Sequence, residues 1–170
     1  MLPRGVDRPI PAADPDYAER LAVPWTLEQY AAQAAAARAA DRGALRSRID
    51  GQSASGLCQV FGNLTPLGIA GTGLCAVLPG GRRAVRVELE ALAGRADLYP
   101  LEVAVEVAGQ PCGSMTIKAG AKVERTFELE AAPASPFEVR LIPERWCVLT
   151  QGERTGLGSF RFLTLEAVED

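Results

Sequence analysis

The sequence predicts an all-β protein, an antiparallel β-sandwich of jelly-roll type that follows an N-terminal extended arm and one α-helix. The segment 101–107 alternates valine or leucine with glutamate or alanine, which is typical of a strand with one buried and one solvated face. Similar alternation recurs at 85–91, 137–141 and 160–168. Glycine- and proline-rich turns separate these segments at about the 8–12-residue spacing of sandwiches and barrels.

Length and charge narrow the classes of protein further. The 170 residues are 48% hydrophobic and fit an arm with a helix at 1–50 and a sandwich domain at 51–170. The net charge of −3 and the lack of a basic patch exclude nucleic-acid binding, and no apolar run is long enough to span a membrane. The N-terminus has no apolar signal region. We expect a chain that is made in the cytoplasm without a signal peptide. Whether it becomes part of a released particle is left open.

The first 50 residues have their own character. Residues 1–25 hold five of the twelve prolines, which favours an extended arm with one short helix near 14–21. Thr26–Arg42 predicts the one clear helix, because it is rich in alanine and begins with capping-box spacing. This helix either lies on the sandwich or docks a partner, and we expect a protein partner or self-assembly through residues 1–50. The candidate docking residues are Trp25, Leu27 and Tyr30.

The remaining chain is read as a series of short strands. Residues 44–50 predict a connector, and the glycine-rich segments 62–73 and 151–158 predict loops. The first of these loops has no lysine, which argues against a phosphate cradle. Turns are expected at 109–111 and 119–121. The predicted strands are 57–61, 74–78, 85–91, 101–107, 115–119, 122–130, 137–141, 146–149 and 160–168.

The four cysteines show no metal-site spacing. Cys58, Cys75, Cys112 and Cys147 form no C-x-x-C motif, and the chain contains no histidine. We therefore expect no metal and no cofactor, and four small thiols that are buried and reduced. The leading exception is a Cys58–Cys75 disulfide, because these two cysteines fall on strands that could be neighbours.

The chain also lacks the usual equipment for catalysis. A nucleophilic triad needs a base, and histidine is absent. Ser114 and Lys118 lie on one predicted strand, where four residues span roughly 13 Å, too far for a hydrogen bond. The glutamates alternate along strands and are expected to face water. The sequence therefore predicts a protein that is not an enzyme and has no catalytic residues.

Two clusters are candidates for sugar recognition, which combines an aromatic ring with polar groups that pair hydroxyls. The alternative for the aromatic residue of the first cluster is a place in the core at the end of the sandwich. The first cluster is Glu144, Arg145, Trp146, Gln151, Glu153 and Arg154. The second is Asp97 and Tyr99.

The pattern of the second half resembles a known class of module. Val105, Val107, Gly109, Pro111 and Gly113 match a V-x-V-x-G-x-P-x-G hairpin. Together with the Leu-Gly-rich loop before the last strand, residues of about 55–168 resemble jelly-roll β-sandwich modules of sugar-binding type found beside bacterial glycosyltransferases.

The resemblance implies a carbohydrate-binding or adhesion module. Together with the N-terminal arm and the missing catalytic groups, it leads us to expect a non-enzymatic component of a larger assembly, docked through that arm. A cell-surface glycan is the expected ligand. Two alternatives are kept: a purely structural protein such as a virion-like spike base, decoration or adaptor, and an accessory domain that partners a glycan-processing enzyme.

Overall fold

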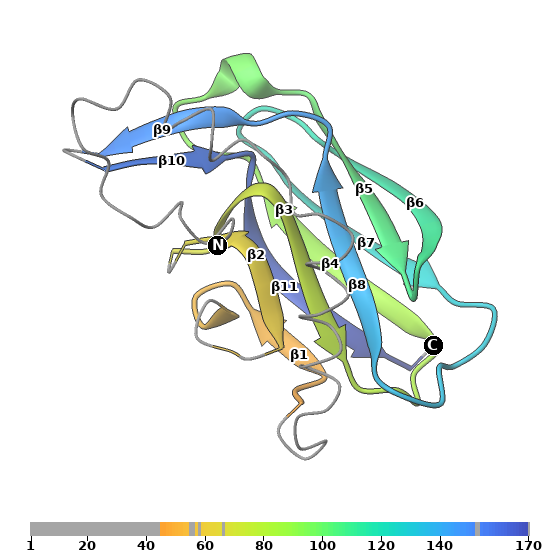
Figure 1. The fold of residues 1–170 in the computed structure, drawn as a ribbon. Helices are drawn as coiled ribbons and strands as arrows, with labels where there is room; N and C mark the ends of the chain where they lie inside the picture. Colours follow the sequence, from red (N-terminus) through yellow and green to blue (C-terminus); the bar gives the residue numbers. More distant parts are fainter. Residues whose placement is uncertain (1–44, 55–56, 58, 66, 152–153, 170) are drawn as a thin grey trace.

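The computed structural model describes residues 45–54, 57, 59–65, 67–151 and 154–169 (Figure 1). The predicted arm and helix, with Trp25, Leu27 and Tyr30, lie outside the described residues. The regular secondary structure of the described part is almost entirely antiparallel β-strand, which confirms the predicted all-β fold class. Among the described residues, no helix is long and apolar enough to cross a membrane.

Eleven strands and one 3-10 turn make up the described chain. They are β1 (Arg48–Asp50), β2 (Val60–Leu64), β3 (Ile69–Leu78), β4 (Ala84–Glu90), η4 (Ala96–Leu98), β5 (Leu101–Val107), β6 (Gln110–Ile117), β7 (Lys122–Glu128), β8 (Phe137–Pro143), β9 (Cys147–Gln151), β10 (Arg154–Gly158) and β11 (Phe160–Val168).

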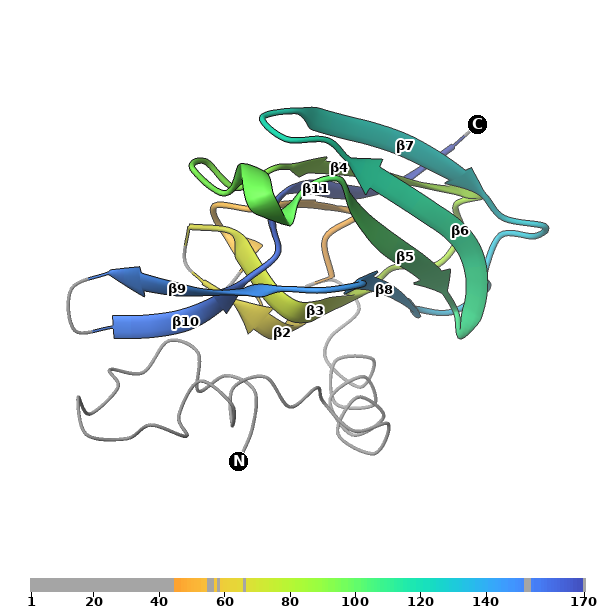
Figure 2. The ribbon, with the colours of Figure 1, turned by 90° about the horizontal axis from the view of Figure 1, so that it is seen from above.

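The strands pack as two antiparallel layers. Pairing follows the order β6-β5-β8-β3-β11-β4-β7, with β2 added to β3 and β1 added to β11. The path bends between β3 and β11, which pair only through Phe160 with Ala70 and Arg161 with Ile69. One layer is therefore β2-β3-β8-β5-β6 and the other is β1-β11-β4-β7 (Figure 2). The β9–β10 hairpin forms its own small sheet and lies against β3.

The core is formed by the alternating apolar side chains that the sequence predicts. In β5 the buried residues alternate with more exposed ones, and the same holds for β4, β8 and β11. Buried neighbours face one another in register across the sheet, as Val105 does with Leu141 and Leu141 with Leu74. The buried residues of β5 are Leu101, Val103, Val105 and Val107.

Several boundaries differ from the prediction for local reasons. β3 begins at Ile69, because the glycine-rich segment expected to be a loop pairs with β2 and β11. β10 lies in another segment expected to be a loop. The turn between β5 and β6 consists of Ala108 and Gly109, which both have positive φ, as in a two-residue type I′ turn. Because the turn is this short, β6 already begins at Gln110.

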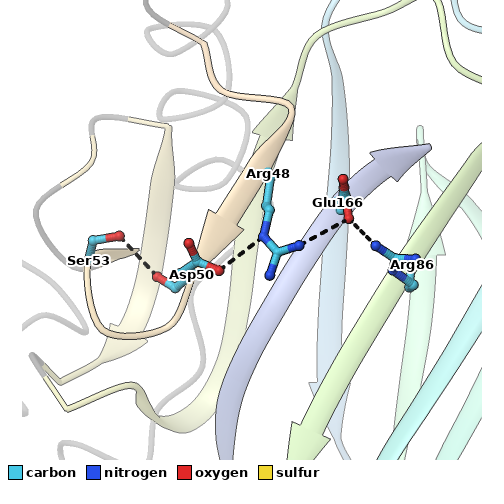
Figure 3. Close-up of polar contacts among 5 residues, drawn as sticks. All are labelled: Arg48, Asp50, Ser53, Arg86 and Glu166. Carbon is cyan, nitrogen blue, oxygen red and sulfur yellow. Dashed lines mark hydrogen bonds and ion pairs between the residues drawn. The ribbon is translucent and has the colours of Figure 1, made fainter.

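β1 was expected to be a connector, but it pairs with β11 just before the predicted domain boundary at residue 51. Ion pairs hold it there (Figure 3). The Arg48 guanidinium lies 3.2 Å from Asp50 and 3.7 Å from Glu166, and Glu166 also pairs with Arg86 of β4. Three adjacent strands are thus joined by one carboxylate on the outer surface of their layer.

The proposed Cys58–Cys75 disulfide is wrong. Cys75, Cys112 and Cys147 are all thiols outside any disulfide. The register gives the reason, because the residue directly opposite Cys75 on β2 is Phe61. Cys75 is buried, as was predicted for all four thiols, whereas Cys112 on the edge strand β6 and Cys147 at the start of β9 are only half-buried.

Candidate functional site

The loops that carry the predicted sugar residues meet at one end of the sandwich. The segment between β4 and β5 lies there, beside the β8–β9 connection and the β9–β10 hairpin (Figure 1). The structure brings Arg145 of the first cluster to the backbone next to Asp97 and Tyr99, although these residues are more than forty positions apart in sequence. What each side chain does there depends on its hydrogen bonds.

The buried Tyr99 side chain links two backbone segments at this end of the sandwich. Its ring is buried, its hydroxyl donates to the Ser159 carbonyl at 2.8 Å, and it accepts from the Leu92 N–H at 2.6 Å. Burial raises the pKa of the phenol, because the charged form loses its hydration. The side chain thus joins the β4–β5 segment to the start of β11 and faces the interior.

Replacing Tyr99 by phenylalanine is expected to lower the free energy of unfolding by about 1–3 kcal/mol at pH 7, because a buried N–H loses its acceptor. The raised pKa means that the folded chain holds the phenolic proton more tightly than the unfolded chain. This contribution is fully present below about pH 10 and is lost as the pH rises through the folded-state pKa. Urea unfolding at pH 7, 9 and 11 should show the gap between wild type and variant narrowing only at the highest pH. Ser114→Ala, which removes an exposed hydroxyl, is the control, and an equal loss there would contradict the assignment.

Arg145 and Glu144 are also used by the fold. The Arg145 guanidinium donates to the carbonyl oxygens of Leu98, at 2.6 Å, and Pro100. It also pairs with Glu144 at 2.7 Å, and Glu144 accepts from the Glu102 N–H at 3.1 Å. Both side chains therefore fasten the loop before β5 to the end of β8.

Asp97 is exposed and forms a two-pronged pair with Arg95, with both oxygen–nitrogen distances at 3.1 Å. The hydrogen bond from Arg95 lowers the pKa of the Asp97 carboxyl. Arg95 reaches on to the Val148 carbonyl at 3.4 Å, and burial raises the pKa of the neighbouring Cys147 thiol. Asp97 is thus a charged group on the surface of the predicted cluster.

Trp146 is half-buried, and its place in a sugar site stays a prediction. The backbones of Gln151 and Arg154 face each other where β9 meets β10. Their side chains, and residue Glu153, lie outside the described part of the chain, so these predictions also stand as made.

The sequence did not point to two adjoining hollows on the same end. The Leu92 hollow, of about 360 Å³, lies between the β2–β3 turn, the β4–β5 segment and β9. Its wall is aliphatic, with a charged pair formed by Glu90 and Arg161, whose nitrogen and oxygen are 3.8 Å apart. Leu67, 62% exposed, stands at its edge. The hollow is lined by Leu67, Ile69, Glu90, Ala91, Leu92, Ala93, Leu149 and Arg161.

The second, the Gly51 hollow, has about 330 Å³ and shares Leu67 and Arg161 with the first. The turn after β1 forms its other wall, through Asp50 and Gly51. Arg161 thus stands between the two hollows and can pair with groups in either. No signal in a single sequence finds this site, because its residues come from five separate segments and each looks like an ordinary strand end.

No cluster of acidic or sulfur ligands suited to a metal occurs among the described residues. The chain has no histidine to serve as a base. An aliphatic wall beside a guanidinium and a carboxylate can hold a small ligand with an apolar face and polar substituents.

No protein-family model matches the sequence, and no curated protein matches it. Several solved structures do. One is the carbohydrate-binding module CBM36 in complex with calcium and xylotriose, with a TM-score of 0.42 and 10% identity over 71% of this chain and 98% of that one. Another is the CBM36-1 domain of a multidomain xylanase from the hindgut metagenome of Trinervitermes trinervoides, with a TM-score of 0.37 and 10% identity over 61% of this chain and 77% of that one.

A third is the acetyl xylan esterase Est2A from the rumen bacterium Butyrivibrio proteoclasticus, with a TM-score of 0.42 and 15% identity. The match covers 74% of this chain and 33% of the esterase, so it spans about a third of that enzyme. Carbohydrate-binding modules, the class that the sequence resembles, are thus among the solved structures that match.

Proposed function

We propose that this chain is a non-enzymatic β-sandwich module that binds a carbohydrate in the Leu92 hollow. The observation that carries the proposal is the pairing of an aliphatic wall with a guanidinium and a carboxylate on an open surface. The apolar face of a sugar ring fits against leucine and isoleucine side chains. Arginine and glutamate are planar groups that pair neighbouring hydroxyls.

The size of the hollow agrees with this proposal. About 360 Å³ falls at the small end of the range of roughly 300–1,000 Å³ for small-molecule sites. The Glu90–Arg161 pair is part-exposed, so it contributes little to stability and is available to rearrange around a ligand. The resemblance of the second half of the chain to sugar-binding modules supports the same ligand class.

We further propose that the module works within a larger assembly, attached by its N-terminal residues. The proline-rich composition of residues 1–25 and the aromatic Trp25 support this role. Of the alternatives predicted from the sequence, a structural component would bind no glycan, so the next experiment separates it from this proposal. An accessory domain that partners a glycan-processing enzyme would still bind one.

A glycan array with the full-length chain, followed by calorimetric titration of the best ligand, tests the site. Arg161→Gln is expected to weaken binding by about 10- to 100-fold, since hydrogen bonds to charged groups are worth about 1.5–3 kcal/mol. Arg86→Gln is the matched control, because it breaks a similar surface ion pair on the same face of the fold without touching the hollow. It should bind as the wild type does.

Trp146→Ala distinguishes the two candidate surfaces. Loss of binding in this variant, with Arg161→Gln unaffected, would move the site to the predicted Trp146 cluster. A folded chain that binds no glycan at all would overturn the carbohydrate proposal and favour the structural alternative.

A further inference from the structure

Two side chains of β3 point away from the core and yet have no exposed surface. Leu74 and Ala76 belong to the core between the layers, so the alternation of the strand places Cys75 and Val77 on the outer face. Both are nonetheless 0% exposed. The outer face of a layer in a two-layer sandwich normally meets water.

The burial extends to the next strand. Arg140 lies opposite Cys75 and Glu138 lies opposite Val77 on β8. Their side chains are only 21% and 14% exposed, and they pair with each other at 3.2 Å. On the next strand, β5, the outer face of the layer is exposed to solvent, as Ala104 shows. The patch, defined as the outer face of β3 and β8 around Cys75, Val77, Glu138 and Arg140, is thus shielded from solvent although it lies outside the core.

The chain reaches the sandwich beside the same patch. Leu45, the first described residue, is buried. The Gln59 side chain accepts from the Arg46 N–H at 2.9 Å and donates to the Arg46 carbonyl at 3.0 Å. The same amide donates to the Val77 carbonyl at 2.9 Å. Residue 46 is thereby tied to the end of β3 that carries the patch.

This anchor limits where the preceding residues can be. The predicted helix Thr26–Arg42 ends three residues before Leu45, and three residues span at most about 10 Å. A helix of this length is about 25 Å long. The ten residues of β3 extend for about 33 Å, so the helix fits along the strand.

The composition of the helix suits this face. Its middle is almost all alanine, and small side chains allow a helix to approach a sheet closely. The patch presents small residues at its centre, Cys75 and Val77, with the charged pair at its border. The segment also carries charges of both signs, among them Glu28 and Arg38.

We propose that the helix Thr26–Arg42 of this same chain is the third layer that covers the patch. Its apolar side, Leu27, Tyr30, Ala31 and Ala34, lies on β3 and β8. The sandwich then includes the helix as part of one folded unit, and Leu27 and Tyr30 are used within the chain. Only residues 1–25, with Trp25, remain to dock a partner. This inference is independent of the proposed sugar site.

The test measures the protection of the Cys75 thiol in the full-length chain. Reaction with a maleimide is followed by mass spectrometry of each cysteine peptide, with half-buried Cys112 as the internal reference. Ala34→Asp places a charge on the covering side of the helix and is expected to speed modification of Cys75 by at least about 10-fold, because an unpaired buried charge opens the layer. Ala36→Asp lowers the helix propensity equally but lies on the opposite side of the helix. It should leave the rate of Cys75 modification unchanged. Equal rates for Cys75 in the wild type and in both variants would overturn the proposal.

A second measurement identifies which chain supplies the helix. Ala34→Cys, under mild oxidation, is expected to form a bond to Cys75 within one chain, whereas Ala36→Cys is not. Mixing two chains with different tags reports any bond between chains. Cross-links between chains would show that a second copy covers the patch, and cross-links from neither position would remove the helix from it. Either result contradicts the proposal.

Discussion

Replacing Phe160 by alanine is expected to lower the free energy of unfolding by about 3–5 kcal/mol, the range for deleting a large buried ring. Phe160 is 0% exposed and pairs with Ala70 at the point where β11 passes from one layer to the other. The residue before it, Ser159, is buried and donates its hydroxyl to the carbonyls of Ala70 and Gly71 at 3.1 and 2.7 Å. A cavity at this point therefore weakens the junction between the layers as well as the core.

Urea unfolding measures this loss, with Ile142→Ala as the control. Ile142 is on the outer face of β8 and exposed, so its truncation should cost less than about 1 kcal/mol. Since a domain is stable by only about 5–15 kcal/mol, the Phe160 variant should also unfold at markedly lower urea concentration. Equal midpoints for the two variants would show that the junction relaxes around the cavity.

The strands that could be predicted are those whose period of two is regular. β5 and β11 occur at the predicted residues, and β7 and β8 differ only at their last residues. In β5, β7 and β11 one face meets the core and the other meets water, and β8 keeps the same alternation of apolar and charged residues, so the sequence carries the full pattern. Arg125 lies on β7, the last strand in the pairing order, where its guanidinium donates to the Ser114 carbonyl and lies 4.9 Å from the centre of the Phe127 ring.

The strands that were missed, or found only in part as β3 was at 74–78, lack this pattern for physical reasons. β3 is buried on both faces along nearly its whole length, so its residues show no alternation, and the glycines at its start read as a loop. β1 has only three residues, and β10 pairs only with β9. Short strands of this kind are defined by their neighbours, which a local pattern does not contain.

The candidate site was predicted only in part. The sequence found groups that do lie together at one end of the sandwich, but it could not show that Tyr99, Glu144 and Arg145 are engaged by the protein's own backbone. The Leu92 hollow depends on the meeting of Glu90 with Arg161, which are 71 residues apart and come together only through the pairing of β4 with β11. Such a site follows from topology rather than from a motif.

Gly51 lies in the turn after β1, and replacing it by alanine is expected to lower the free energy of unfolding by about 3 kcal/mol or more. A Cβ at this position would lie far inside the van der Waals distance of the Phe162 carbonyl oxygen. The Gly51 N–H donates to the Leu163 carbonyl at 2.8 Å, so the turn cannot move away without losing that bond. The clash is with backbone, which no side-chain rotation relieves.

Gly94→Ala is the matched control for this substitution. Gly94 has φ of +75°, and a Cβ at this position would have no atom within 4 Å, so alanine there meets only backbone strain of about 1 kcal/mol. Hydrogen exchange of the full-length chain separates the two effects. Gly51→Ala should increase exchange along β1 and at its pairing with β11, because the Arg48–Glu166 ion pair depends on that register (Figure 3). Gly94→Ala should leave β1 protected.

If the two variants lose the same stability and β1 stays protected in both, the turn is free to shift and β1 is a minor addition to the sheet. The expected outcome has a structural consequence for the boundary of the domain. A strand whose loss costs several kcal/mol belongs to the folded unit, and this one ends at Asp50, before the predicted boundary. Because Leu45 is buried and Arg46 is fixed to Gln59 just ahead of that strand, the sandwich and the residues that lead into it would then be stabilised together.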